Sequence, residues 1–62
     1  MSQLHLHPNI DQPDELYEQL LQAHEGLSTE DSLKLLFKLS LLLSNHIGNR
    51  EVVAQALALS RP

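Results

Sequence analysis

Residues 28–48 read STEDSLKLLFKLSLLLSNHIG, a pattern that predicts one long helix. Ser28 is a favoured N-cap residue, and Asp31 lies three positions on, with carboxylates in the first turn. Gly48 can adopt the left-handed conformation that often ends a helix. At 1.5 Å per residue, the predicted helix is roughly 28 Å long.

The predicted helix is apolar over an unusually wide part of its circumference. Its polar residues fall on one narrow stripe formed by Asp31, Lys34, Lys38 and Asn45. A helix on a one-sided core usually has an apolar stripe of somewhat over 100°, and this one spans roughly twice that. We therefore expect it to be covered on most sides and to form an interface. The residues predicted for this interface are Leu35, Leu36, Phe37, Leu39, Ser40, Leu42, Leu43 and Ser44.

The chain is short enough that we expect it to need help to be stable. Its 62 residues make one domain at most, and a domain of this size buries only about 60% of its unfolded surface. Small domains usually rely on disulfides, a metal or oligomerisation. With no cysteine, disulfides and thiolate metal sites are excluded. We therefore expect a homodimer.

The flanking residues complete an all-α prediction. Residues 1–10 form an extended arm, in which Leu4 to His7 alternate with period two and Pro8 disfavours helix. Residues 11–62 form a single three-helix domain. Its first helix begins near Asp11 or Gln12 and ends at Gly26, and its third follows the N-cap residue Asn49. The short connection after Gly26 predicts an antiparallel hairpin of the first two helices.

Charge and hydropathy exclude several functional classes. The net charge is −4, and every ionised residue before Lys34 is acidic, which argues against nucleic-acid binding. The acidic half is explained by a solvated helix face, although a basic protein partner would also fit it. The apolar run is short and broken by Lys38, so we expect no membrane span. Met1 to Gln3 lack the basic start of a signal peptide, and we expect a cytoplasmic protein.

The four histidines are the only residues that suggest chemistry. His24 and His46 are expected near helix carboxyl ends, where the helix dipole favours a cation. In the predicted hairpin, His46 would approach His5 and His7, and three imidazoles could hold Zn²⁺ with an open position. The spacing matches no established zinc motif. Residues for catalysis or for a cofactor are not evident, so we expect no enzyme and no cofactor.

Three segments of the chain carry a resemblance to a known family. These are PNI…QPDELY at residues 8–17, AHEGLS at 23–28 and LLLSNHIGN at 41–49. The chain resembles short uncharacterised bacterial proteins that share a domain of unknown function, with Lys38 where relatives would have Arg and Ser44 where they would have Ala. The family implies no activity or catalytic residues. It implies genes beside oxidoreductases of small-molecule catabolism, which favours an accessory subunit with a partner enzyme.

Two functional hypotheses follow from the sequence. The first is a non-enzymatic interaction or accessory-subunit protein that acts through the apolar second helix, since exposed apolar area of this extent usually marks an interface. The second is a small metal- or ligand-binding protein that uses His5, His7 and His46.

Overall fold

The computed structural model describes residues 2–62 and is all-α, as predicted. Helix α1 spans Pro13–Ala23, α2 spans Thr29–Ile47 and α3 spans Arg50–Ser60. No strand occurs among residues 2–62. Met1, the first residue of the predicted arm, lies outside the described residues.

Helix α2 begins and ends, and α3 begins, where the local sequence predicts. The Ser28 hydroxyl accepts a hydrogen bond from the Asp31 backbone N–H at 3.1 Å, which caps α2. Gly48 takes φ 72°, and its N–H donates to the Ser44 carbonyl at 2.9 Å. Asn49 then caps α3 by accepting from the Val52 N–H at 3.1 Å. These side chains and one glycine satisfy groups that a helix end leaves unpaired.

Helix α1 is shorter than predicted at both ends. It begins at Pro13, after Gln12, which has φ 50° and makes no side-chain cap. It ends at Ala23, and a turn through Gly26, with φ 76°, follows before α2. Because proline supplies no N–H and has a fixed φ, it suits the first helical position. Proline therefore sets the start of α1.

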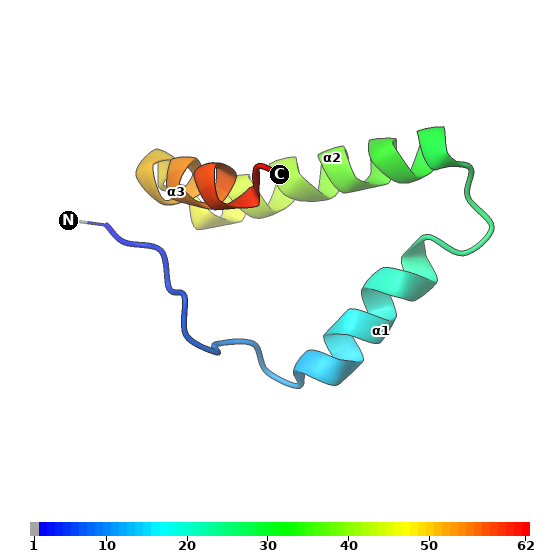
Figure 1. Ribbon diagram of the computed structural model, residues 1–62, viewed down its shortest axis with the longest axis horizontal. Coiled ribbons are helices and arrows are strands. Elements are labelled where there is room, and N and C mark those ends of the chain that lie inside the picture. Colours follow the sequence, from blue (N-terminus) through cyan, green and yellow to red (C-terminus); the bar gives the residue numbers. More distant parts are fainter. Residues whose placement is uncertain (1) are drawn as a thin grey trace.

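The predicted antiparallel hairpin of the first two helices is corrected by the structure. Within residues 2–62, α2 and α3 are the only helices that pack against each other. Helices α1 and α2 diverge from their connection at residues 24–28 (Figure 1). A short connection fixes the distance between two helix ends but not the angle between the helices. The turn at Gly48 instead folds α3 back onto the carboxyl-terminal half of α2.

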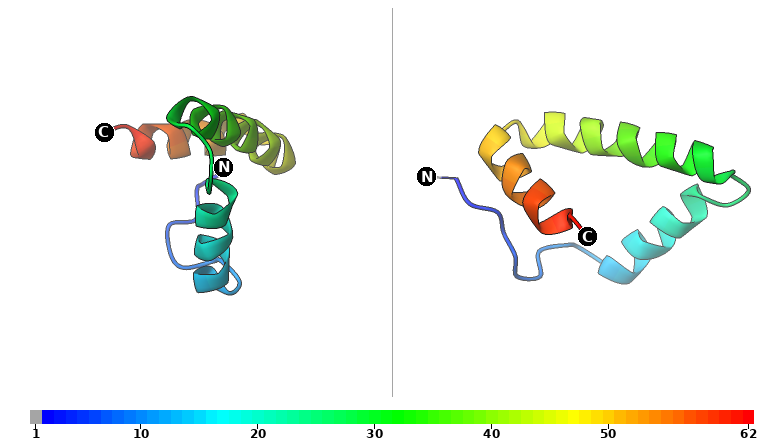
Figure 2. Two further views of the ribbon diagram at one scale, coloured as in Figure 1. Left: turned by 90° about the vertical axis from the view of Figure 1, so that its right-hand side faces the viewer. Right: turned by 45° about the horizontal axis from the view of Figure 1, so that its top comes forward.

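Residues 2–12 form an arm with no helix or strand. The arm runs from the start of α1 back to α3, so that the chain outlines a three-sided frame (Figure 2). Leu4 is half-buried, whereas Leu6 is 73% exposed. Of the two leucines in the arm, Leu4 therefore approaches the helices and Leu6 does not.

The single chain leaves an unusually large surface uncovered. Its accessible surface is 5955 Å², whereas a folded monomer of 7.0 kDa is expected to have about 4,000 Å². None of residues 2–62 is fully buried. The expected covering of α2 on most sides is therefore not provided by its own chain.

Candidate interaction surface

One side of the carboxyl-terminal half of α2 packs against α3. A shallow hollow of about 230 Å³ marks the seam between the two helices, with Leu4 of the arm at its edge. The α2 residues that line the seam are Ser40, Leu43, Ser44 and Ile47, and the α3 residues are Val52, Val53, Ala56, Leu57 and Ser60. Three residues of the predicted interface, namely Ser40, Leu43 and Ser44, thus face another helix of the same chain.

Ser40 illustrates how a polar residue is accommodated in this seam. Its hydroxyl donates to the Leu36 carbonyl, four residues back, at 2.9 Å. The bond satisfies the hydroxyl inside its own helix. Because serine is small, it also permits the close approach of α3.

A second side of α2 carries an exposed apolar ridge. Leu33, Phe37 and Leu41 recur every four residues and are 63%, 67% and 56% exposed. Residues four apart lie one above the other on a helix, so the three form a continuous strip. Phe37 belongs to the predicted interface, whereas Leu33 and Leu41 were not assigned to it. The spacing of four was the signal that would have added them.

The remaining predicted interface residues of α2 differ in their exposure to solvent. Leu35 and Leu39 are half-buried, and Leu36 is exposed. Leu42, which is 69% exposed, lies across the polar stripe from the ridge. Apolar side chains therefore remain uncovered on both flanks of the Lys34 and Lys38 stripe.

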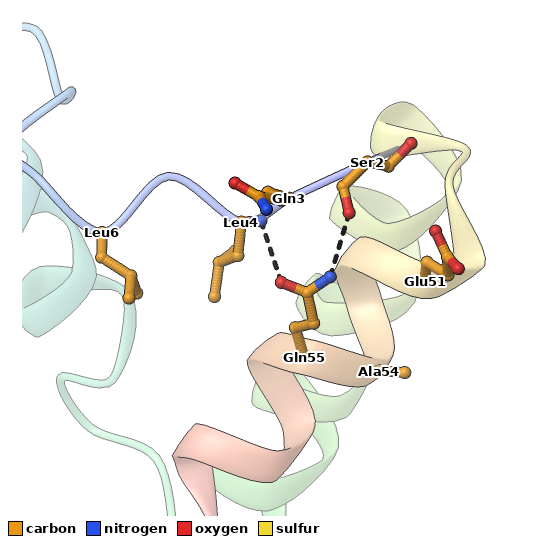
Figure 3. Close-up of a pocket in the computed structure, with 7 residues that line it drawn as sticks. All are labelled: Ser2, Gln3, Leu4, Leu6, Glu51, Ala54 and Gln55. Carbon is orange, nitrogen blue, oxygen red and sulfur yellow. Dashed lines mark hydrogen bonds between the residues drawn. The ribbon is translucent and has the colours of Figure 1, made fainter.

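The arm is held to α3 by a glutamine that sequence reasoning did not identify. The Gln55 amide accepts from the Leu4 backbone N–H at 3.0 Å through Oε1 and donates to the Ser2 carbonyl at 3.1 Å through Nε2 (Figure 3). The Asn49 amide also donates to the Ser2 hydroxyl. Gln55 thereby pairs with the arm backbone as a neighbouring strand would. A lone amide among the apolar residues of α3 was the available signal.

The histidines do not form the predicted three-imidazole group. The ring centroids of His5 and His7 are 5.5 Å apart in an edge-on arrangement. Nevertheless, no group of three or more His, Asp or Glu residues that could hold a metal ion occurs within residues 2–62. His46 lies in the last turn of α2 and His24 is the C-cap residue of α1. Both positions agree with the helix-dipole explanation.

The hollow between the arm and α3 has little of the character of an active site. It has a volume of about 580 Å³, is open to solvent, and is lined by Leu4, Glu51, Gln55 and their neighbours (Figure 3). Pockets for small molecules usually enclose most of the ligand.

Over residues 2–62, no helix is both long enough and apolar enough to cross a membrane.

Comparison with known protein families identifies a match over most of the chain. The model of a family described as "Protein of unknown function (DUF2783)" matches residues 4–62. No curated protein and no solved structure matches the chain.

Proposed function

The chain belongs to this family of proteins of unknown function, and we propose that it is a non-enzymatic interaction protein, an accessory subunit whose apolar α2 surface is covered by a partner. The observation that carries the proposal is the uncovered surface. The chain exposes about 1,900 Å² more than a folded monomer of its mass is expected to expose.

The composition of this surface supports an interaction. The exposed side chains include the ridge residues Leu33, Phe37 and Leu41 on α2 and Tyr17 and Leu21 on α1. Contiguous apolar patches on soluble proteins mark interaction sites. The excess area also exceeds the roughly 800 Å² that each partner contributes to a standard interface. If a partner covered this surface, the accessible area of the chain would fall to the value expected for a protein of its mass.

The proposal is tested on the purified full chain by following thermal unfolding and native mass over a range of concentrations. We expect either an assembly whose melting temperature rises with concentration, or a chain that gains stable structure only with a partner. A monomer that unfolds cooperatively, independently of concentration and with slow amide exchange throughout α1 and α2, would refute the proposal.

An accessory role with a partner enzyme predicts two further results. The enzyme must co-purify with the chain in a fixed ratio from cells at native expression level. The Leu42→Glu variant must release that enzyme, because Leu42 is 69% exposed and lies outside the ridge that carries Phe37.

A further inference from the structure

Helices α1 and α2 carry two exposed edges with the same spacing and opposite charge. Each residue of the α2 edge lies 20 positions after its counterpart on α1. The edge of α1 consists of Asp14, Tyr17, Glu18 and Leu21, and the edge of α2 consists of Lys34, Phe37, Lys38 and Leu41. An aromatic and a leucine thus recur on both helices, beside two acids on one and two lysines on the other.

Both edges are uncovered in the single chain. Tyr17 is 64% exposed and Leu21 is 52% exposed, comparable to Phe37 and Leu41. The charged residues of both edges are also exposed. Offsets of three, four and seven residues keep each set on one side of its helix. Each edge therefore consists of an exposed aromatic residue and leucine, with two charged side chains along one side of them.

The handedness of the two edges favours an antiparallel crossing. On α1 the acids lie to one side of Tyr17 and Leu21, and on α2 the lysines lie to the same side of Phe37 and Leu41. When two helices cross antiparallel, corresponding flanks face each other. The aromatic and leucine of one helix then meet those of the other, and Glu18 lies beside Lys38.

Within one chain these edges do not meet, because α1 packs on neither α2 nor α3. We propose that a second copy of this chain supplies the missing contact, with α1 of each copy laid on the α2 edge of the other. The inference rests on the proposed function and names its partner. Such a dimer is isologous, because the contact of α1 with α2 occurs twice about a two-fold axis.

The areas agree with a dimer of this kind. Two copies that each cover an excess of about 1,900 Å² would bury about 3,800 Å² in total, within the range of obligate homodimers. The charge distribution agrees as well. Residues before Lys34 carry seven acids and no base, and residues from Lys34 onward carry four bases and one acid. Reciprocal packing places the acidic half of each copy against the basic half of the other.

The test uses two charge-reversal variants of the full chain, Glu18→Lys and Lys38→Glu, mixed in equal amounts. Each variant alone places like charges together at both contacts of its own dimer, and we expect its dissociation constant to rise roughly tenfold or more. In a mixed dimer, one contact is wild type, and the other pairs the introduced lysine of the first variant with the introduced glutamate of the second. Mixed dimers should therefore predominate over both self-dimers.

The readout is native mass spectrometry with one variant isotopically labelled, together with sedimentation equilibrium of each protein alone. Matched controls reverse charges away from the edges. Glu15→Lys lies on the opposite side of α1 from Tyr17, and Arg61→Glu follows α3. Both should form self-dimers and mixed dimers in statistical proportions.

Three outcomes would overturn the inference, and they are distinguishable. A statistical mixture of the edge variants would show that α1 does not contact the other copy. The same result is expected if α1 closes on α2 within one chain, because mixing two variants cannot restore a contact inside either of them. A wild-type chain that is monomeric and lacks stable structure without another protein would exclude the second copy but leave the proposed function standing. A wild-type chain that is a stably folded monomer would overturn both.

Discussion

Helices α1 and α3, near the two ends of the chain, have the same length but differ in the contacts that stabilise them. Helix α3 contributes the half-buried residues Val52, Val53, Gln55 and Ala56, and the arm is bonded to it. Helix α1, of the same 11-residue length, contributes only Leu16. Isolated helices of this length are marginal in water. Helix α3 is therefore stabilised by contacts within its own chain, whereas α1 lacks such contacts, and we propose that a second copy supplies them.

The largest effect should come from a charge at Phe37, where we propose that α1 of the other copy packs. We expect Phe37→Glu to dissociate the assembly, because a buried, unpaired carboxylate costs about 3 kcal/mol or more, which is over a hundredfold in the dissociation constant. Sedimentation velocity measures the dissociation. Circular dichroism should show the loss of the α1 contribution, while NMR signals of the Gln55 side-chain amide persist.

The matched control adds the same charge on a solvated position. Gln19→Glu lies on the exposed polar face of α1 and should leave the assembly intact. If Phe37→Glu had no more effect than Gln19→Glu, the difference between the two ends would not arise from a partner. Loss of the Gln55 signals as well would show that α3 also depends on the assembly.

A smaller effect should follow from releasing the arm. Gln55→Ala removes both hydrogen bonds to the backbone of Ser2 and Leu4, and we expect a loss of about 1–2 kcal/mol because the freed groups can bond water. Hydrogen exchange at the Leu4 amide should accelerate about tenfold or more, with no direct change in α1.

The conservative variant at this position separates the two bonds. Gln55→Glu keeps an acceptor for the Leu4 N–H but sets a carboxylate oxygen against the Ser2 carbonyl. Its effect on exchange should fall between those of wild type and Gln55→Ala. Equal exchange in all three proteins would show that the arm is held by packing alone.

The sequence predicted the local parts of this fold well. Ser28, Gly48 and Asn49 act on groups within four residues of themselves, so their roles can be inferred from neighbouring residues alone. The all-α class follows from these signals and from helical spacing.

The parts that the sequence did not predict depend on residues far apart in the chain. Gln55 bonds residues more than 50 positions away, and no local pattern specifies that contact. The hairpin prediction failed for a related reason, since the apolar stripes of α1 and α2 show that each helix needs a neighbour without identifying it. The same stripes gave an interface that included Phe37 but omitted Leu33 and Leu41.

The smallest effect should distinguish two helix caps that look alike by sequence. Ser28 accepts one hydrogen bond, from Asp31, whereas Asn49 accepts from Val52 and also donates to Ser2. Replacing either by alanine removes a cap, at a cost of about 1 kcal/mol. We expect Asn49→Ala to cost about 0.5–1 kcal/mol more than Ser28→Ala in urea unfolding, because it also loosens the arm.

Asn49→Ser isolates that difference. Serine is an equally good N-cap residue, but its shorter side chain has no amide to donate to the Ser2 hydroxyl. The variant should retain the stability of α3 and still accelerate exchange at the Leu4 amide. If Asn49→Ser left exchange in the arm unchanged, the bond to Ser2 would add nothing to the anchoring by Gln55. The two caps would then be equivalent, and the greater burial of the carboxyl-terminal end would derive from the α2–α3 seam and Gln55 alone.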